Sequence, residues 1–289
     1  MDKSIRRVKN ISALYLLPSV IGVALFFVLP FLVVIYYSMI DNPISGEFVF
    51  LDNFAGLFTN KAFQTAAGNS LTFSFTAVPL VIVLSLGVAF LLDKNIPGKS
   101  KIRAAFLSPM MVPVASVILI WQVLFHYNGL VNEVLMSFGG GKIDWLKSEY
   151  AQIVIVVLFV WKNLGYNMIL FMAALANIPK EVVEVAELES ATKWQIFWHL
   201  KLRYLSSSIL FVTILSLINS FKIFREVYLL TGDYPYETLY MLQHYMNNMF
   251  RSLDYQKLSA AAIIMSLFMI VLIGILFFAE NVVGKDLDG

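Results

Sequence analysis

Six long apolar runs constrain the fold of this chain more than any other feature of its sequence. They cover residues 13–40, 66–92, 104–125, 153–176, 207–230 and 258–279. Each run is long enough to cross about 30 Å of hydrocarbon, which takes roughly 20 helical residues. Because 59% of the 289 residues are hydrophobic and only 14% are charged, a water-soluble core of this size would not enclose the apolar surface. The sequence therefore predicts a polytopic membrane protein.

The runs indicate helices rather than barrel strands. A transmembrane strand takes about ten residues of alternating polarity, whereas these runs are continuous. Several of them contain prolines, namely Pro18, Pro30, Pro79, Pro109 and Pro113. Proline does not exclude a membrane helix, because neighbouring helices can satisfy the backbone groups that it frees. We therefore expect an all-α integral membrane protein with about six transmembrane helices.

Lysine and arginine are concentrated in every second segment between the runs, and such segments are expected on the cytoplasmic side. The enriched segments contain Lys3, Arg6, Arg7 and Lys9, then Lys94, Lys99, Lys101 and Arg103, then Lys180, Lys193, Lys201 and Arg203, and finally Lys285. The other segments contain Lys61, Lys142, Lys147, Arg251 and Lys257. This bias predicts a multi-pass plasma-membrane protein with cytoplasmic tails at residues 1–12 and 281–289, a membrane domain at 13–280 and a cytoplasmic loop at 177–206.

The loop at residues 177–206 carries signals for two short helices joined by a tight turn. Pro179 suits the first position of a helix, and Glu181 and Glu184 favour the positive end of its dipole. Thr192 and Gln195 have the spacing of a capping box, which would start the second helix. The apolar side of that helix contains Trp194, Phe197, Trp198 and Leu200. The pattern fits an elbow held at the membrane surface, or an amphipathic connector lying on lipid.

The same loop resembles the signature of a known family. From Glu184 onward it reads EVAELESATKWQIFWHLKLRYL, which is similar to the signature of permease subunits of binding-protein-dependent ABC importers. Glu184, Ala186 and Ala191 match the family pattern, and Ser190 occupies the usual glycine position. Further blocks resemble the carbohydrate-importer (maltose/multiple-sugar-like) branch in the expected order: LLPSVIGVALFFVLPFL, FLDNFAGLF, NSLTFS, VWKNLGYNMILFMAALANIP, SFKIFREVYLLTGDYP and ETLYMLQHYMNNMF.

The sequence also departs from the family pattern. Val185 replaces the middle alanine of the signature, and Arg203 and Ser207 stand where prolines are usual. Arg225 stands at a position that is usually aspartate. If the turn at Ser190 requires a positive φ, serine would be strained where glycine is free.

The resemblance implies a MetI-like permease core in a bacterial cytoplasmic membrane and a set of partners. These are a second homologous permease subunit, expected as a heterodimer, two ATP-binding cassette ATPase subunits and an extracytoplasmic solute-binding protein. ATP and Mg²⁺ would be bound by the ATPase subunits, so this chain would be no enzyme and would hold no cofactor. The loop would couple it to an ATPase subunit through Glu184, Ala186, Glu187, Glu189, Ser190, Ala191 and Phe197.

Two polar and aromatic stripes are candidates for the substrate path. The first lies on the fourth run and contains Asn163, Tyr166, Asn167 and Phe171. The second lies on the fifth run and contains Asn219, Phe221, Phe224 and Tyr228. Amide groups beside aromatic faces suit sugar recognition. Ordinary interhelical hydrogen bonding would also explain these residues, and the partner permease could instead hold most of the substrate.

Charged residues lie within or at the ends of the same two runs. Lys222 and Glu226 are four positions apart, so on one helix they are able to pair. Arg225 and Glu226 are adjacent and would point about 100° apart on a helix, so we do not expect them to pair. Lys162 lies inside the fourth run. Such charges usually face a bundle interior or a water-filled cavity, or they extend to the membrane interface.

Other chemistries find no support in the sequence. The chain has no cysteine, and its three histidines, His126, His199 and His244, are isolated, so no metal site or catalytic constellation is predicted. The net charge of +2 is dispersed and suggests no nucleic-acid partner. The remaining alternatives are a permease for a non-sugar solute, an ion-driven secondary transporter and a membrane-embedded enzyme.

Overall fold

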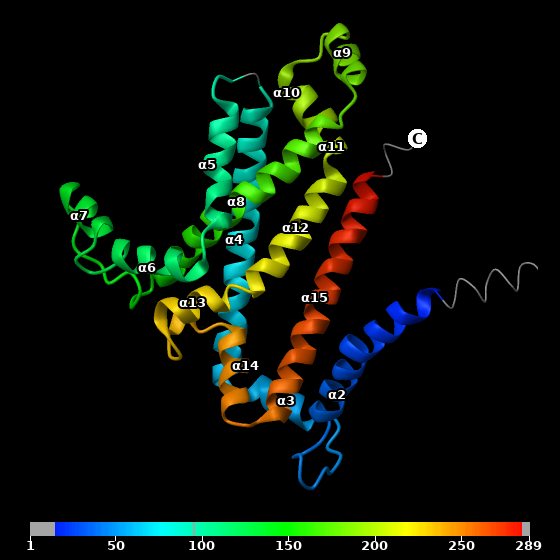
Figure 1. Ribbon diagram of the computed structural model, residues 1–289, viewed down its shortest axis with the longest axis vertical. Coiled ribbons are helices and arrows are strands. Elements are labelled where there is room, and N and C mark those ends of the chain that lie inside the picture. Colours follow the sequence, from blue (N-terminus) through cyan, green and yellow to red (C-terminus); the bar gives the residue numbers. More distant parts are fainter. Residues whose placement is uncertain (1–14, 95, 285–289) are drawn as a thin grey trace, which may run out of the picture. The chain divides into compact units, whose positions relative to one another are not determined.

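The computed structural model describes residues 15–94 and 96–284, and within them the chain is helical (Figure 1). No β-strand occurs in this described part, where an isolated bridge pairs Ile40 with Phe48. The predicted tail at 1–12 and residues 285–289 of the predicted tail at 281–289 lie outside the described residues, whereas residues 281–284 continue the last helix. The helices are η1 (Ala24–Val28), α2 (Leu29–Ser38), α3 (Asp52–Thr59), α4 (Lys61–Asp93), α5 (Lys99–Met111), α6 (Val114–Leu124), α7 (Leu130–Ser137), α8 (Ala151–Ala176), α9 (Lys180–Leu188), α10 (Lys193–Gln195), η2 (Ile196–Lys201), α11 (Leu202–Tyr204), α12 (Ser206–Phe221), α13 (Phe224–Thr231), η3 (Glu237–Leu239), α14 (Leu242–Arg251) and α15 (Tyr255–Gly284).

The predicted membrane helices are confirmed for five of the six apolar runs. Helical segments long and apolar enough to cross a membrane cover Tyr15–Ser38, Lys61–Asp93, Ala151–Ala176, Ser206–Thr231 and Tyr255–Asn281. Pro79 lies inside α4 without ending it, as expected for a membrane helix with neighbours. The described residues therefore provide five candidate spans, or up to six if α5 and α6 count as one.

The third apolar run is not one continuous helix, which corrects the prediction for residues 104–125. It forms α5 and α6, whose axes differ by 99°. Val112, between them, has an extended conformation with φ −84° and ψ 132°. The residue before a proline disfavours the helical region, and proline itself offers no N–H to the preceding turn. Pro113 therefore ends α5 and starts α6 in a new direction.

The described chain divides into two compact units, each with its own packing. Unit one comprises residues of Met1–Lys61 and Met246–Phe268, and unit two comprises Ala62–Tyr245 and Met269–Gly289. In unit one, Asn53 ties the loop after α2 to α3 by donating from Nδ2 to the carbonyl oxygens of Ser38 (3.0 Å) and Ile40 (2.8 Å).

Unit two is built around α8, which packs against α5 and α12. One core cluster joins α4, α6, α8 and α13, and in it the rings of Phe73 and Phe159 meet edge to face at 5.5 Å. A second cluster joins the ends of α4 and α8 to α12 and contains Leu92, Phe171 and Val212. A membrane offers little hydrophobic driving force between helices, so close packing and hydrogen bonds such as these hold the bundle together.

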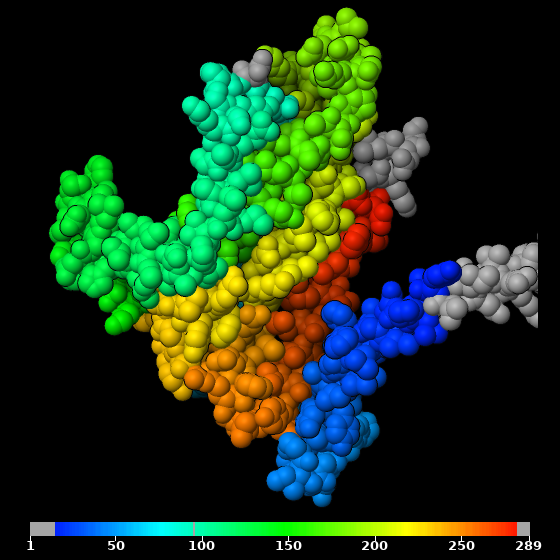
Figure 2. All heavy atoms as spheres, in the orientation of Figure 1, coloured from blue at the N-terminus to red at the C-terminus, as the bar shows by residue number. Residues whose placement is uncertain are grey.

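Helices α6 and α7 extend from unit two as an arm (Figure 2). The loop that follows α7 is fixed by the side chain of Asn132, which is fully buried. Its Nδ2 donates to the carbonyl oxygens of Tyr127 (2.9 Å) and Ile143 (2.8 Å), and its Oδ1 accepts from the indole of Trp145 (2.9 Å). One amide therefore holds two backbone carbonyls and the Trp145 indole of this segment in place.

Candidate functional site

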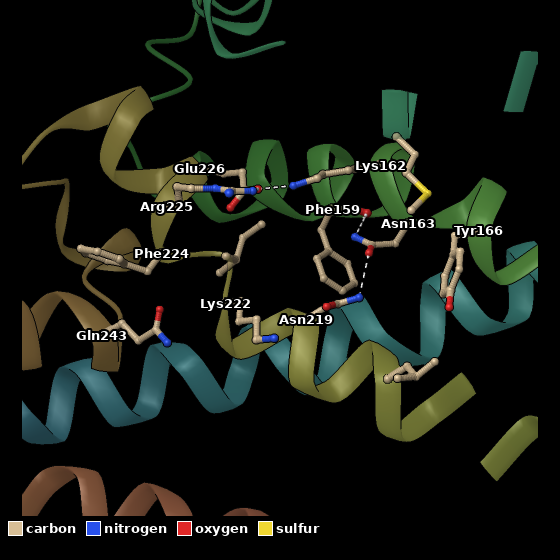
Figure 3. A pocket seen from close by; sticks show the side chains of 13 residues that line it. Phe159, Lys162, Asn163, Tyr166, Asn219, Lys222, Phe224, Arg225, Glu226 and Gln243 are labelled. Atoms are coloured by element: carbon tan, nitrogen blue, oxygen red, sulfur yellow. Dashed lines mark hydrogen bonds and ion pairs between the residues drawn. The ribbon is translucent and has the colours of Figure 1, made fainter. Parts of the chain in front are cut away.

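A polar cavity of about 600 Å³ lies within unit two, beside α8, the junction of α12 and α13, and the start of α14 (Figure 3). Apolar residues, including Met110 of α5 and Phe159 of α8, form part of its wall. The polar residues that line it are Lys162, Asn163, Tyr166, Asn219, Lys222, Arg225, Glu226 and Gln243. So many polar groups at the depth of membrane helices are typical of a water-filled path or binding site.

A break between α12 and α13 explains how the fifth run supplies several of these residues. Helix α12 ends at Phe221 and α13 begins at Phe224, with Lys222 and Ile223 between them. Lys222 and Glu226, which would be able to pair on one continuous helix, form no ion pair among the described residues. The four-residue spacing brings side chains together only on a continuous helix, and here the helix is interrupted.

Glu226 is instead the centre of a different charge cluster. Its side chain is buried, with the residue 3% exposed. Lys162 Nζ of α8 donates to Glu226 Oε1, and Arg225 Nη2 lies 3.3 Å from the same oxygen. The expectation that Arg225 and Glu226 do not pair was therefore wrong, because the arginine side chain is long enough to reach the neighbouring carboxylate. A buried carboxylate is costly unless paired, and the cluster supplies two cations.

Four of the eight substrate-path candidates line the cavity. These are Asn163, Tyr166, Asn219 and Phe224. Asn163 and Asn219 join the two helices, because Asn219 Nδ2 donates to Asn163 Oδ1 at 3.3 Å. In Figure 3 both amides lie beside the cavity and Tyr166 projects next to them. The amides and the phenol present donors and acceptors to a hydroxylated solute.

The other four candidates lie outside the cavity lining. Asn167 is buried and its Nδ2 donates to Ser216 Oγ at 2.9 Å, so it serves interhelical packing. Phe171 is fully buried in the second core cluster. Tyr228 packs against Phe224 with ring centroids 5.4 Å apart, and Phe221 is the last residue of α12.

Sequence reasoning did not select several residues that the structure brings to this site. Lys162 was recognised as a charge within a span, but its partner Glu226 is 64 residues away in sequence. Met110 and Gln243 lie on α5 and α14 and carry no local signal of a common site. Only the three-dimensional packing of four helices places these residues together.

His244, on α14, is buried beside the cavity residue Phe224. Its ring meets the Phe224 ring edge to face at 4.6 Å, and its Nε2 has no hydrogen-bond partner among the described residues. Burial lowers the pKa of His244 to about 4, although Asp233 acts in the opposite direction. The imidazole is therefore neutral at physiological pH.

The predicted turn of the loop at 177–206 is present and has a defined geometry. After α9, Ser190 N donates to Glu187 O and Ala191 N donates to Ala186 O, both at 3.0 Å. These two bonds form a Schellman motif, in which the residue after the C-cap adopts a left-handed conformation and is usually glycine. Ser190 occupies that position with φ +64°. The expected strain at Ser190 is therefore confirmed.

The predicted capping box at the start of the second helix is also confirmed. Gln195 N donates to Thr192 Oγ1 at 3.3 Å, and Thr192 N donates to Gln195 Oε1 at 2.8 Å. The helix then continues through η2 and α11 to Tyr204. The loop therefore contains two helical segments and a tight turn, as the sequence indicated.

The aromatic side of this second helix is only partly buried. Phe197 packs against Phe90 of α4 with ring centroids 4.8 Å apart, and Ile196 is buried. Trp194 and Trp198 are 69% and 48% exposed. The carboxylates nearest the turn are exposed as well, at Glu184, Glu187 and Glu189.

No group of three or more histidine, cysteine, aspartate or glutamate side chains in the described part of the chain is arranged to hold a metal ion.

Comparison with known proteins places the chain in a family. Residues 54–288 match the family described as "Binding-protein-dependent transport system inner membrane component". The chain belongs to this family. Among its relatives, the lactose transport system permease protein LacF of Rhizobium radiobacter is 28% identical and covers 98% of this chain and 97% of its own length. The sn-glycerol-3-phosphate transport system permease protein UgpA of Yersinia enterocolitica is 30% identical over 91% of this chain and 92% of its own length.

Solved structures agree on the fold of this family member. A bacterial alginate ABC transporter, crystallised with an alginate pentasaccharide-bound periplasmic protein, contains a chain that superposes with a TM-score of 0.82. The match covers 98% of both chains at 20% sequence identity. The chain is therefore a multi-pass membrane permease component with the helical fold of the ABC importer permeases.

Proposed function

We propose that this chain, with a second homologous permease subunit, forms the translocation path for a sugar or oligosaccharide in a bacterial ABC importer. The observation that carries the proposal is the cavity in unit two, where amide, hydroxyl and aromatic groups converge inside a family permease. Relatives named for lactose, arabinooligosaccharide and trehalose/maltose transport support a carbohydrate cargo. A solute-binding protein would deliver the cargo from outside the membrane.

The loop at 177–206 is proposed as the cytoplasmic attachment for an ATPase subunit. Its exposed tip combines carboxylates with apolar side chains, including Leu188 at 85% exposure and Val185 at 54% exposure. This combination suits docking into a groove that has a basic residue on its rim. Two ATPase subunits would bind ATP and Mg²⁺, and their closure would move the loop and switch the cavity between the two sides of the membrane. Both termini of the chain would be cytoplasmic.

Glu184→Lys in the complete transporter tests this coupling. Glu184 is exposed and makes no ion pair within the described residues, so charge reversal should leave the permease folded. We expect the ATPase subunits to copurify less well and sugar uptake to fall at least about tenfold, as expected for an interfacial charge pair that loses one partner.

The matched control is Glu149→Lys, which reverses an exposed glutamate in the loop predicted to lie outside the cell. Uptake should remain at the wild-type level in this variant. Normal uptake and normal ATPase binding in Glu184→Lys would contradict the coupling role. Transport of sugar by the purified chain alone, without ATPase subunits, would favour a secondary transporter.

A further inference from the structure

The cavity of unit two has an unbalanced charge. Lys162, Lys222 and Arg225 contribute three cations to its lining, and Glu226 contributes one carboxylate. Glu226 is shared between Lys162 and Arg225, so it neutralises no more than one of them. The described lining therefore has an excess of positive charge.

Lys222 and Arg225 carry most of this excess. Lys222 is exposed and makes no ion pair among the described residues, and its side chain extends away from Glu226 in Figure 3. Arg225 contacts Glu226 through Nη2 while its side chain is 65% exposed. A guanidinium has five N–H donors, so a single contact leaves most of them available to another anion.

These charges lie within membrane helices or beside the start of α13, where an unpaired positive charge favours a bound anion. Lys162 lies near the middle of the candidate span Ala151–Ala176, where charged groups are costly unless they face water or a counter-ion. The first turn of α13 also lines the cavity through Phe224, Arg225 and Glu226. The positive end of the helix dipole there adds to the attraction for an anion.

We propose that the cargo is a polyhydroxylated solute that carries an acidic group, such as a carboxylate, phosphate or sulfonate. Lys222 and Arg225 bind the acidic group and determine specificity for it. Asn163, Asn219 and Tyr166 line the same cavity and bind the hydroxyl groups of the cargo. This inference rests on the proposed function, since it assumes that the cavity is part of the translocation path.

The test measures the binding of matched sugars to the complete transporter in lipid nanodiscs by saturation-transfer NMR and titration. The probes are D-glucose, D-glucuronate and D-glucose 6-phosphate, which share a ring and differ in charge. We expect the two anionic probes to bind at least about tenfold more tightly than glucose, as one charge-assisted contact provides. Raising the salt concentration should weaken this preference.

Two variants assign the preference to the named residues. Lys222→Gln and Arg225→Gln should each lower the affinity for the anionic probes by about tenfold, toward that of glucose. Lys222→Arg should retain the preference because it retains the charge. Lys147→Gln is the matched control, because Lys147 is an exposed lysine outside the cavity lining, and it should bind all three probes as the wild type does.

Several results would overturn the proposal. Equal affinity of the wild type for the three probes, or no binding of any of them, would remove the preference that defines it. Loss of the second permease subunit from Lys222→Gln, but not from Lys222→Arg, would show that the charge faces an acidic residue of the partner. If glucose and glucuronate bind equally and ATP-driven uptake of a sugar persists, this inference falls while the proposed function stands. Absence of any ATP-driven sugar uptake would remove the proposed function itself.

Discussion

Gly165→Ala is expected to disrupt the wall of the cavity, and the structure allows its effect to be worked out. A Cβ atom at Gly165 of α8 would lie 1.9 Å from the carbonyl oxygen of Phe106 in α5 and 2.5 Å from its carbonyl carbon. Ordinary contacts of Cβ atoms begin at 3.4 Å, so α5 and α8 would have to separate by about 1.5 Å. Backbone atoms cannot rotate away as a flexible side chain does.

The free energy of unfolding should therefore fall. Overpacking of this kind costs about 1–3 kcal/mol, and contact with a backbone carbonyl places it at about 3 kcal/mol. Replacing glycine by alanine in a helix returns about 1 kcal/mol. The net loss of about 2 kcal/mol corresponds to a decrease in Tm of roughly 4–8 °C. The measurement is thermal unfolding of the complete transporter in nanodiscs.

Gly87→Ala is the matched control. Gly87 also lies in a long membrane helix, α4, but a Cβ there would meet no atom within 4 Å. Its Tm should remain unchanged or rise slightly, because only the helix propensity changes. If Gly165→Ala and Gly87→Ala melt at the same temperature, then α5 and α8 do not approach each other as closely as described, and the argument fails.

Two further predictions concern the loop and the pH dependence of stability. Ser190→Gly should stabilise the chain by about 1 kcal/mol because glycine adopts φ +64° without strain. Ser190→Ala keeps a Cβ and should not stabilise it. Equal Tm values for the two variants would contradict this reasoning. The buried His244 has its pKa lowered to about 4, below the ordinary 6.5, so the unfolded chain takes up a proton first as the pH falls. The neutral imidazole therefore adds about 3 kcal/mol to the free energy of unfolding above about pH 6.5, and this contribution is lost as the pH falls to about 4. His244→Leu should flatten this pH dependence, the exposed His126→Leu should not, and an unchanged profile in His244→Leu would assign the effect to other groups.

Local signals in the sequence predicted much of the fold. The six long apolar runs predicted membrane helices, and five of them are confirmed, because hydrophobic length largely decides whether a segment can span a bilayer. Thr192 and Gln195 predicted a helix start, since a capping box depends only on residues three positions apart. The strained turn at Ser190 was expected because the family pattern has glycine there.

Features that depend on tertiary packing were harder to predict from the sequence. Pro79 and Pro113 both lie in apolar runs, yet only Pro113 coincides with a break, because neighbouring helices decide whether freed backbone groups are satisfied. Asn163 and Asn167 lie on the same side of α8, but Ser216 of α12 covers only the second. The lysine that pairs with Glu226, Lys162, lies on α8, so helical spacing within the fifth run pointed to Lys222 instead. The sequence therefore predicted two of the runs that form the site, and four of its eight candidate residues line the cavity.

The bend at Val112 has a consequence for how this protein exists in a bilayer. The last turn of α5 ends with carbonyl groups that no amide of the same helix reaches, and Pro113 brings no hydrogen to them. Lipid tails cannot hydrogen-bond to these carbonyls, and each backbone group that lacks a hydrogen bond in the bilayer core costs several kcal/mol. Water, other parts of the chain or a partner subunit must therefore border this bend, so lipid alone cannot surround it.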